Sequence, residues 1–190
     1  MTNRLLTLLT LSTLLPTFIL ADTTGFYLGG GLGAGIQNIN TSQGAHYADS
    51  MAYRAFAGYQ IWSFLGAELG YTHIGPANSW NNVNSLSSNI VDLSVTPGLK
   101  IPLIPLTVYA RLGFAGINTS SSNNALQTSG TPYTGEWGGG AKIDIPFIST
   151  FVRAEYINFG NQQRLNSPNG AFNNGRISPS TFMLSAGYIF

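Results

Sequence analysis

Apolar and polar side chains alternate with a period of two along most of the chain after residue 24, and this alternation strongly constrains the fold. It is clearest in residues 91–100, where apolar side chains occupy odd positions: Val91, Leu93, Val95 and Leu99. Successive side chains point to opposite faces of a β-strand, whereas a helical pattern would repeat every 3.6 residues. Seven further segments alternate in the same way: 25–37, 53–61, 65–72, 107–114, 136–145, 152–156 and 181–190. The sequence therefore predicts an all-β fold of eight strands, with lengths near the ~9–11 residues that a tilted strand needs to cross a bilayer.

The charged residues of these segments all lie on the polar face. The bases are Arg54, Lys100, Arg111, Lys142 and Arg153, and the acids are Glu68, Asp92, Glu136, Asp144 and Glu155. Because Arg or Lys on a lipid-facing position at the membrane midplane costs ~2–4 kcal/mol, the polar face is expected to line a lumen. Eight strands enclose a lumen that side chains can fill, and buried charges persist by pairing. We therefore predict an ion-pair network that plugs the lumen rather than an open pore.

Short and long connections alternate between the predicted strands. Three are short, around residues 62–63, 102–105 and 146–150, and four are long and rich in Asn, Ser and Gly, at about 38–49, 75–89, 117–133 and 160–180. Outer-membrane barrels have short periplasmic turns, longer external loops and an even number of strands. The sequence thus predicts an eight-stranded antiparallel up-and-down transmembrane β-barrel with periplasmic turns and external loops.

The first 21 residues have the pattern of an export signal. Arg4 is the only charge before Asp22, and the mostly apolar stretch 5–20 is shorter than the ~20 residues that a transmembrane helix needs. Ala21 supplies a small residue before the expected cleavage site. We therefore expect a cleaved signal peptide at 1–21 and a barrel domain at 22–190 in the bacterial outer membrane.

Composition excludes several functional classes. Only 8 % of the residues are charged, against about 25 % in soluble domains, and the net charge of +1 argues against nucleic-acid binding. The chain has no Cys, and its two histidines, His46 and His73, are too few and too separated for a metal site. Residues 29–34 match G-x-G-x-x-A formally, but they lie inside a predicted strand with no following helix. No catalytic residue, cofactor or metal ion is expected.

Four segments resemble the OmpA-like or opacity-type family of eight-stranded outer-membrane barrels. They are GYQIWSFLGAELGYTHIG at 58–75, VYARLGFAG at 108–116, RAEYINFG at 153–160 and SAGYIF at 185–190. The resemblance implies that Glu68, Arg111, Glu136 and Lys142 occupy the family's lumen ion-pair positions. It also implies that Tyr188 and Phe190 form the signal read by the barrel assembly machinery. Because the chain ends at the last predicted strand, a single-domain form without the periplasmic peptidoglycan-binding domain of full-length members is expected.

Three functions are compatible with this pattern. The favoured one is a noncatalytic outer-membrane barrel that supports the envelope and displays its loops for adhesin-like contacts, because rigid scaffolds commonly present recognition loops. Candidate contact residues in the predicted loops are Tyr47, Trp80, Tyr133 and Phe172. The expected partners are outer-membrane lipid and lipopolysaccharide, the assembly machinery with periplasmic chaperones, and a host-surface or envelope ligand.

The alternatives are a narrow porin-like channel for small solutes and a lipid A-modifying enzyme. Lipid A-modifying barrels of this size use a His with a Ser or an acid near the outer leaflet. His73 is followed by Ile74, Gly75 and Pro76, so a deacylase-like pattern with a Ser two residues later is missing.

Overall fold

The computed structural model describes residues 24–41, 44–77, 86–121, 133–160, 163–165 and 175–190. These residues form one antiparallel sheet whose strands lie in sequence order, except that the short eighth strand pairs only with the ninth, which itself pairs with the seventh. The strands are β1 (Gly25–Thr41), β2 (Gly44–Trp62), β3 (Leu65–Ala77), β4 (Leu86–Lys100), β5 (Leu106–Ser121), β6 (Tyr133–Ile145), β7 (Thr150–Asn158), β8 (Gln163–Leu165) and β9 (Gly175–Ile189). The predicted export signal at 1–21 lies outside the described residues.

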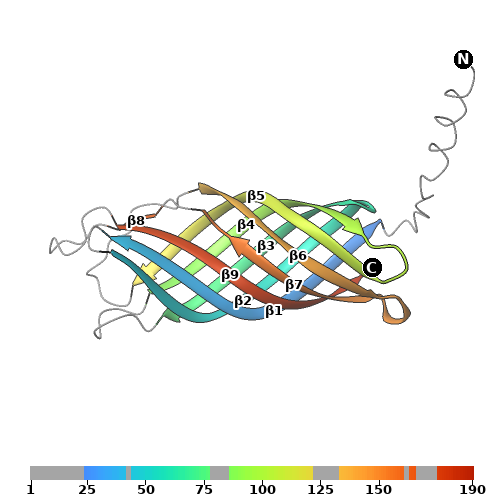
Figure 1. Ribbon diagram of the computed structural model, residues 1–190, viewed down its shortest axis with the longest axis horizontal. Helices are drawn as coiled ribbons and strands as arrows, with labels where there is room; N and C mark the ends of the chain where they lie inside the picture. Colours follow the sequence, from blue (N-terminus) through green and yellow to red (C-terminus); the bar gives the residue numbers. More distant parts are fainter. Residues whose placement is uncertain (1–23, 42–43, 78–85, 122–132, 161–162, 166–174) are drawn as a thin grey trace, which may run out of the picture.

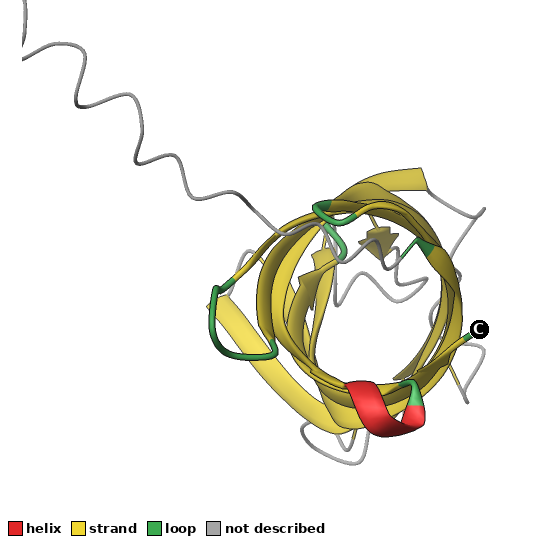
Figure 2. Cartoon of the chain, turned by 90° about the vertical axis from the view of Figure 1, so that its right-hand side faces the viewer, coloured by secondary structure: helices red, strands yellow, loops and turns green. Residues whose placement is uncertain are grey.

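Pairing of β1 with β9 closes the sheet into a barrel (Figures 1 and 2). Tyr27 pairs with Ile189 near one end of this seam and Asn40 pairs with Arg176 near the other. The three-residue strand β8 pairs only with the first residues of β9, beyond the end of β7. The barrel wall therefore has eight strands, which confirms the predicted fold class.

The two ends of the barrel differ in their connections. At the turn end, on the right of Figure 1, residues 63–64 join β2 to β3, residues 101–105 join β4 to β5, and the short 3-10 helix η1 (Pro146–Ile148) leads into β7. Gly25 and Ile189 also lie at this end, where the Phe190 amide donates to the Phe26 carbonyl at 2.8 Å. The opposite end, called the loop end here, carries the other connections.

The strands extend further toward the loop end than the sequence predicted. Residues 38–49 were expected to form a long connection, but β1 continues to Thr41 and β2 begins at Gly44. Asn38 pairs with Tyr47, so the predicted loop contact Tyr47 lies within β2. The prediction of a long loop here was wrong because polar residues can continue a hydrogen-bonded ladder without an apolar face.

Side chains divide between the two faces of the wall as the alternation predicted. On β4, Leu93 is 61 % exposed on the outer face, whereas its neighbour Asp92 is 1 % exposed inside the lumen. The outward residues are mainly Leu, Val, Ala and aromatic side chains. This apolar outer face and polar interior are typical of barrels embedded in lipid. Separately, the described residues contain no helix with the length and hydropathy needed to cross a membrane.

Candidate functional site: the barrel lumen

Seven charged side chains from six strands meet inside the lumen, and we call this cluster the ion network. Its members are Arg54, Glu68, Asp92, Arg111, Glu136, Arg153 and Glu155. Their side chains are at most 4 % exposed. Each inward position alternates with an apolar outward one, so the strand period alone places these charges in the lumen.

Glu68 on β3 is at the centre of the ion network. Its Oε1 accepts hydrogen bonds from Arg111 Nη1 at 2.6 Å, Arg153 Nη2 at 3.1 Å and Arg54 Nη2 at 3.2 Å. Its Oε2 accepts from Arg153 Nη1 at 2.6 Å and from the Tyr27 hydroxyl at 3.2 Å. One carboxylate thus connects three guanidinium groups from three other strands.

Asp92 on β4 and Glu136 on β6 extend the ion network. Both nitrogens of the Arg54 fork donate to Asp92 at 2.8 Å, a bidentate geometry that strengthens and orients the pair. Arg111 Nη2 also donates to Asp92 Oδ1. Arg111 Nε donates to Glu136 Oε1 at 3.0 Å. Arg111 therefore donates hydrogen bonds to three different carboxyl groups, counting Glu68, and its Nη1 also lies 3.9 Å from Glu155 Oε2.

A glycine makes room for the Arg54 fork. A Cβ atom at Gly70 would lie 2.2 Å from Arg54 Nη2 and 2.7 Å from Asp92 Oδ2. The wall must therefore be thin where two bulky charged groups cross the lumen in front of it. The glycine-rich composition of the predicted strands has a local cause at this position.

Apolar side chains fill the lumen on both sides of the ion network. Toward the loop end, the apolar layer has residues that are at most 1 % exposed: Ala52, Ile74, Ile90, Ala115, Ile117, Ile157, Phe159 and Met183. Toward the turn end, the rings of Tyr27, Phe56 and Phe151 pack together with centroids 5.7–6.3 Å apart, and we call them the aromatic layer. Arg153 joins the layers, because its guanidinium lies 3.7 Å from the centroid of the Phe56 ring. The lumen is thus filled by three successive layers.

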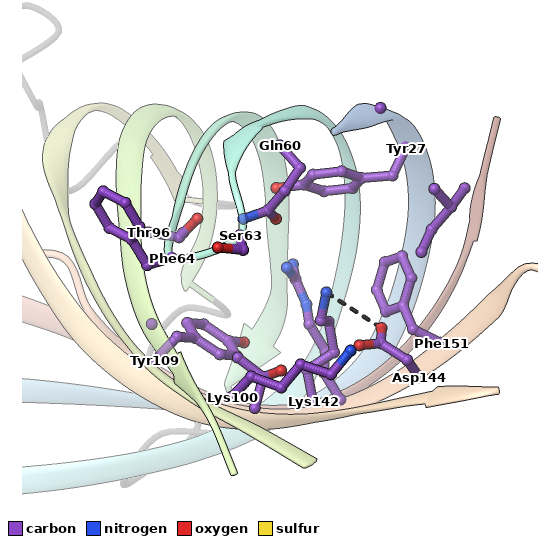
Figure 3. A pocket seen from close by; sticks show the side chains of 15 residues that line it. Tyr27, Gln60, Ser63, Phe64, Thr96, Lys100, Tyr109, Lys142, Asp144 and Phe151 are labelled. Atoms are coloured by element: carbon purple, nitrogen blue, oxygen red, sulfur yellow. Dashed lines mark ion pairs between the residues drawn. The ribbon is translucent and has the colours of Figure 1, made fainter. Parts of the chain in front are cut away.

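A small cavity of about 60 Å³ lies on the turn-end side of the aromatic layer (Figure 3). Lys142 Nζ lies 3.2 Å from Asp144 Oδ1, and this pair is separate from the ion network, with both side chains 22 % exposed. Lys100 lines the same cavity but is exposed and makes no ion pair with a described residue. Lys100, Lys142 and Asp144 were predicted to belong to the ion-pair network, but they lie at the mouth of the barrel instead. The odd or even position of a residue in a strand, its strand parity, indicates which face its side chain occupies. It does not indicate the height of the residue along the barrel axis.

The other predicted residues lie at the ends and on the outer face. Tyr188 and Phe190 are exposed at the turn end, with ring centroids 5.1 Å apart. Tyr133, the first residue of β6, is 81 % exposed at the loop end. Trp80 and Phe172 lie outside the described residues. Tyr133 is thus separated from the ion network along the barrel axis.

His73 lies on the outer face near the loop end. Its ring stacks on Tyr53 at 6.4 Å, and its Nδ1 is 2.8 Å from Asn89 Oδ1, which also accepts from the Tyr71 hydroxyl at 2.8 Å. Within the described ranges, His73 makes no hydrogen bond or ion pair with a Ser, Asp or Glu side chain. Those ranges also contain no group of three or more His, Asp or Glu that could hold a metal ion.

Sequence reasoning missed two tyrosines that support the ion network. The Tyr27 hydroxyl donates to Glu68 and the Tyr109 hydroxyl donates to Glu155 at 3.1 Å. Both residues stand at inward positions of their strands, so parity was the available signal. The apolar layer gave no such signal, because isoleucines on a polar face look like breaks in the pattern.

Comparison with protein families gives a match to the OmpA-like transmembrane domain over residues 21–175. Outer membrane protein A of Klebsiella pneumoniae is 32 % identical over 106 residues, and that of Serratia marcescens is 35 % identical over 91 residues. These segments cover 55 % and 47 % of this chain but only 28 % and 24 % of the two relatives. The matched part is therefore about a quarter of each relative's length.

Solved barrels share the fold at low sequence identity. Neisserial surface protein A superposes with a TM-score of 0.61 and 16 % identity, covering 88 % of this chain and 98 % of its own. The attachment invasion locus protein Ail of Yersinia pestis gives 0.56 and 14 %, covering 88 % and 99 %. At these identities the likeness concerns the fold alone.

Proposed function

The chain belongs to the OmpA-like transmembrane domain family, like its two relatives named outer membrane protein A, and we propose that it is a noncatalytic scaffold of the outer membrane. In this proposal the barrel supports the envelope, and its loop end makes adhesin-like surface contacts. Residues 1–21 direct export and are removed, and Tyr188 with Phe190 presents the strand end that the assembly machinery and periplasmic chaperones recognise.

The observation that carries this proposal is the filling of the lumen by three consecutive layers. Arg111 in the ion network, Ile117 in the apolar layer and Phe151 in the aromatic layer are each at most 1 % exposed. A solute entering from the turn end reaches a cavity of about 60 Å³, which holds only a few water molecules. The layers favour a scaffold over a channel, since the interior of an eight-stranded barrel is just wide enough for its own side chains to fill.

The surface-contact part of the proposal concerns the loop end. Three connections there, 78–85, 122–132 and 166–174, follow or precede rigid strands, an arrangement that suits recognition by loops. Tyr133 supplies an exposed aromatic side chain beside the second of them. Exposed aromatic residues are common anchors of protein contacts.

A strain that lacks the gene separates the two parts of the proposal. It is complemented with the wild type, with Tyr133→Ala, or with a variant in which a four-residue turn replaces residues 122–132. We expect all three to restore resistance to detergent, and the shortened-loop variant to lose adherence to an epithelial monolayer. Full adherence by the shortened-loop variant would refute the contact role of this loop, and detergent sensitivity unaffected by the gene would refute the scaffold role.

A further inference from the structure

The ion network carries more acids than bases. It contains three guanidinium groups, from Arg54, Arg111 and Arg153, and four carboxyl groups, from Glu68, Asp92, Glu136 and Glu155. With every group ionised, the cluster would have a net charge of −1. Burying an uncompensated charge costs several kcal/mol or more, so buried acids commonly become neutral instead.

The charges outside the ion network do not supply the missing positive charge. Lys142 and Asp144 offset each other at the mouth, and Lys100 is exposed beside them. The described side chains of β1 and β9 add no charged group to the cluster. The two neighbouring phenols, Tyr27 and Tyr109, donate hydrogen bonds to carboxylates and carry no positive charge. The imbalance therefore belongs to the buried cluster itself.

The contacts single out one of the four carboxyl groups. Glu68 contacts all three guanidinium groups, and Asp92 contacts Arg54 and Arg111. Glu155 also lies near all three, at 3.0 Å from Arg153, 3.8 Å from Arg54 and 3.9 Å from Arg111. Glu136 has a single cationic contact, Arg111 Nε at 3.0 Å from Oε1. The buried Oε2 of Glu136 has no hydrogen-bond partner among the described residues; Glu155 Oε1 has none either, but that oxygen lies between the guanidinium groups of Arg153 and Arg54.

We propose that Glu136 holds one proton in the folded barrel at neutral pH, on Oε2, so that the ion network contains three positive and three negative charges. The proton comes from water when the chain folds. Glu136 Oε1 still accepts the hydrogen bond from Arg111. Arg54 and Arg111, together with Asp92, are the charged groups that face Glu136 from β2, β5 and β4, and Glu68, Arg153 and Glu155 complete the cluster.

Two consequences are measurable. A neutral carboxyl group has a C=O stretching band at higher frequency than carboxylate, and this band is expected in the infrared spectrum of the folded protein. An exposed Glu is ionised at neutral pH, so folding takes up one proton. The unfolding equilibrium constant therefore gains a factor of about ten per pH unit from this group as pH rises near neutrality.

The test compares the wild type with Glu136→Gln and Asp144→Asn, each as the full mature chain folded in detergent micelles in D2O. We expect the carboxylic-acid band in the wild type and in Asp144→Asn, whose carboxylate lies outside the ion network, and its loss in Glu136→Gln. Since Gln resembles a protonated Glu, Glu136→Gln is expected to have the unfolding constant of the wild type within about threefold near pH 4, where an exposed Glu is itself about half protonated. As pH rises toward neutrality, the constant of Glu136→Gln is expected to fall below that of the wild type by about tenfold per pH unit, because the variant takes up no proton on folding.

The pH dependence supplies a second readout that does not depend on the infrared band. Urea unfolding of the wild type is expected to show the tenfold contribution per pH unit, and Glu136→Gln is expected to lack it. A wild type without the acid band, a band that persists in Glu136→Gln, identical pH slopes in the two proteins, or failure of Glu136→Gln to fold would each overturn the proposal. None of these outcomes bears on adherence or detergent resistance, so the scaffold role is tested independently.

Discussion

Arg111 is the residue on which the centre of the lumen most depends. It donates hydrogen bonds to Glu68, Asp92 and Glu136, and its side chain is fully buried. Its guanidinium therefore bonds carboxyl groups from three other strands at once. A planar fork of five donors suits this position, whereas an ammonium group could not make the same set of directed bonds.

Replacement of Arg111 by alanine is expected to lower the free energy of unfolding by about 3–5 kcal/mol, because its partners would remain buried without their cation. Urea titration of the refolded protein in micelles measures this change. Lys100→Ala is the matched control, since Lys100 is exposed and has no described ion pair, and it should leave the urea midpoint unchanged. An unaltered midpoint for Arg111→Ala would show that the pairs contribute little.

Residue-level reasoning from the sequence reached the correct face for these charges but not their grouping. Lys100 and Lys142 share the parity of Arg54, yet they lie near strand ends at the mouth. Strand parity is a local property, whereas height along the axis depends on the register between strands. The contacts of Glu68 with Arg153, 85 positions later in the chain, could only be found in the folded barrel.

At the scale of the strands, close contact between neighbouring elements sets where side chains can be tolerated. Two of the four glycines in strand β6 have opposite surroundings. A Cβ atom at Gly138 would lie 2.2 Å from the Tyr156 carbonyl oxygen of β7, whereas at Gly135 no heavy atom lies within 4 Å of that position. The same residue type therefore has a packing reason in one place and none in the other.

This difference predicts unequal effects of the same substitution in one strand. Gly138→Ala is expected to destabilise the barrel by about 1–3 kcal/mol, because backbone must move to admit the methyl group. Gly135→Ala should be close to neutral. The two variants are compared by their midpoint temperatures of unfolding. These are measured on gels, where the folded and unfolded barrel migrate differently. Equal midpoints would contradict the packing argument.

The strands themselves were predictable where an apolar outer face imposed alternation, as in β4. The extension of β1 and β2 was not, because residues 38–49 are mostly polar and small, and they resemble a loop in composition. Backbone hydrogen bonds between Asn38 and Tyr47 or between their neighbours do not require a lipid-facing side chain. The sequence therefore marks the part of each strand that faces lipid more reliably than its full length.

At the scale of the whole molecule, the strands form a closed wall (Figure 2), and buried side chains fill its interior. The ion network lies between two apolar layers, so breaking its pairs would still leave the lumen blocked. Phe159 and Met183 in the apolar layer are fully buried on the side of the loop end. Closure is thus a property of the three layers together, and the lumen charges alone do not determine it.

Single-channel recording in a planar bilayer tests the filled lumen most directly. The refolded mature protein is compared with Phe159→Ala and with a wide general porin as the positive control for insertion and recording. We expect no discrete openings from the wild type or from Phe159→Ala, because the ion network and the aromatic layer remain in place. Reproducible openings of the wild type would contradict the scaffold role and favour a small-solute channel.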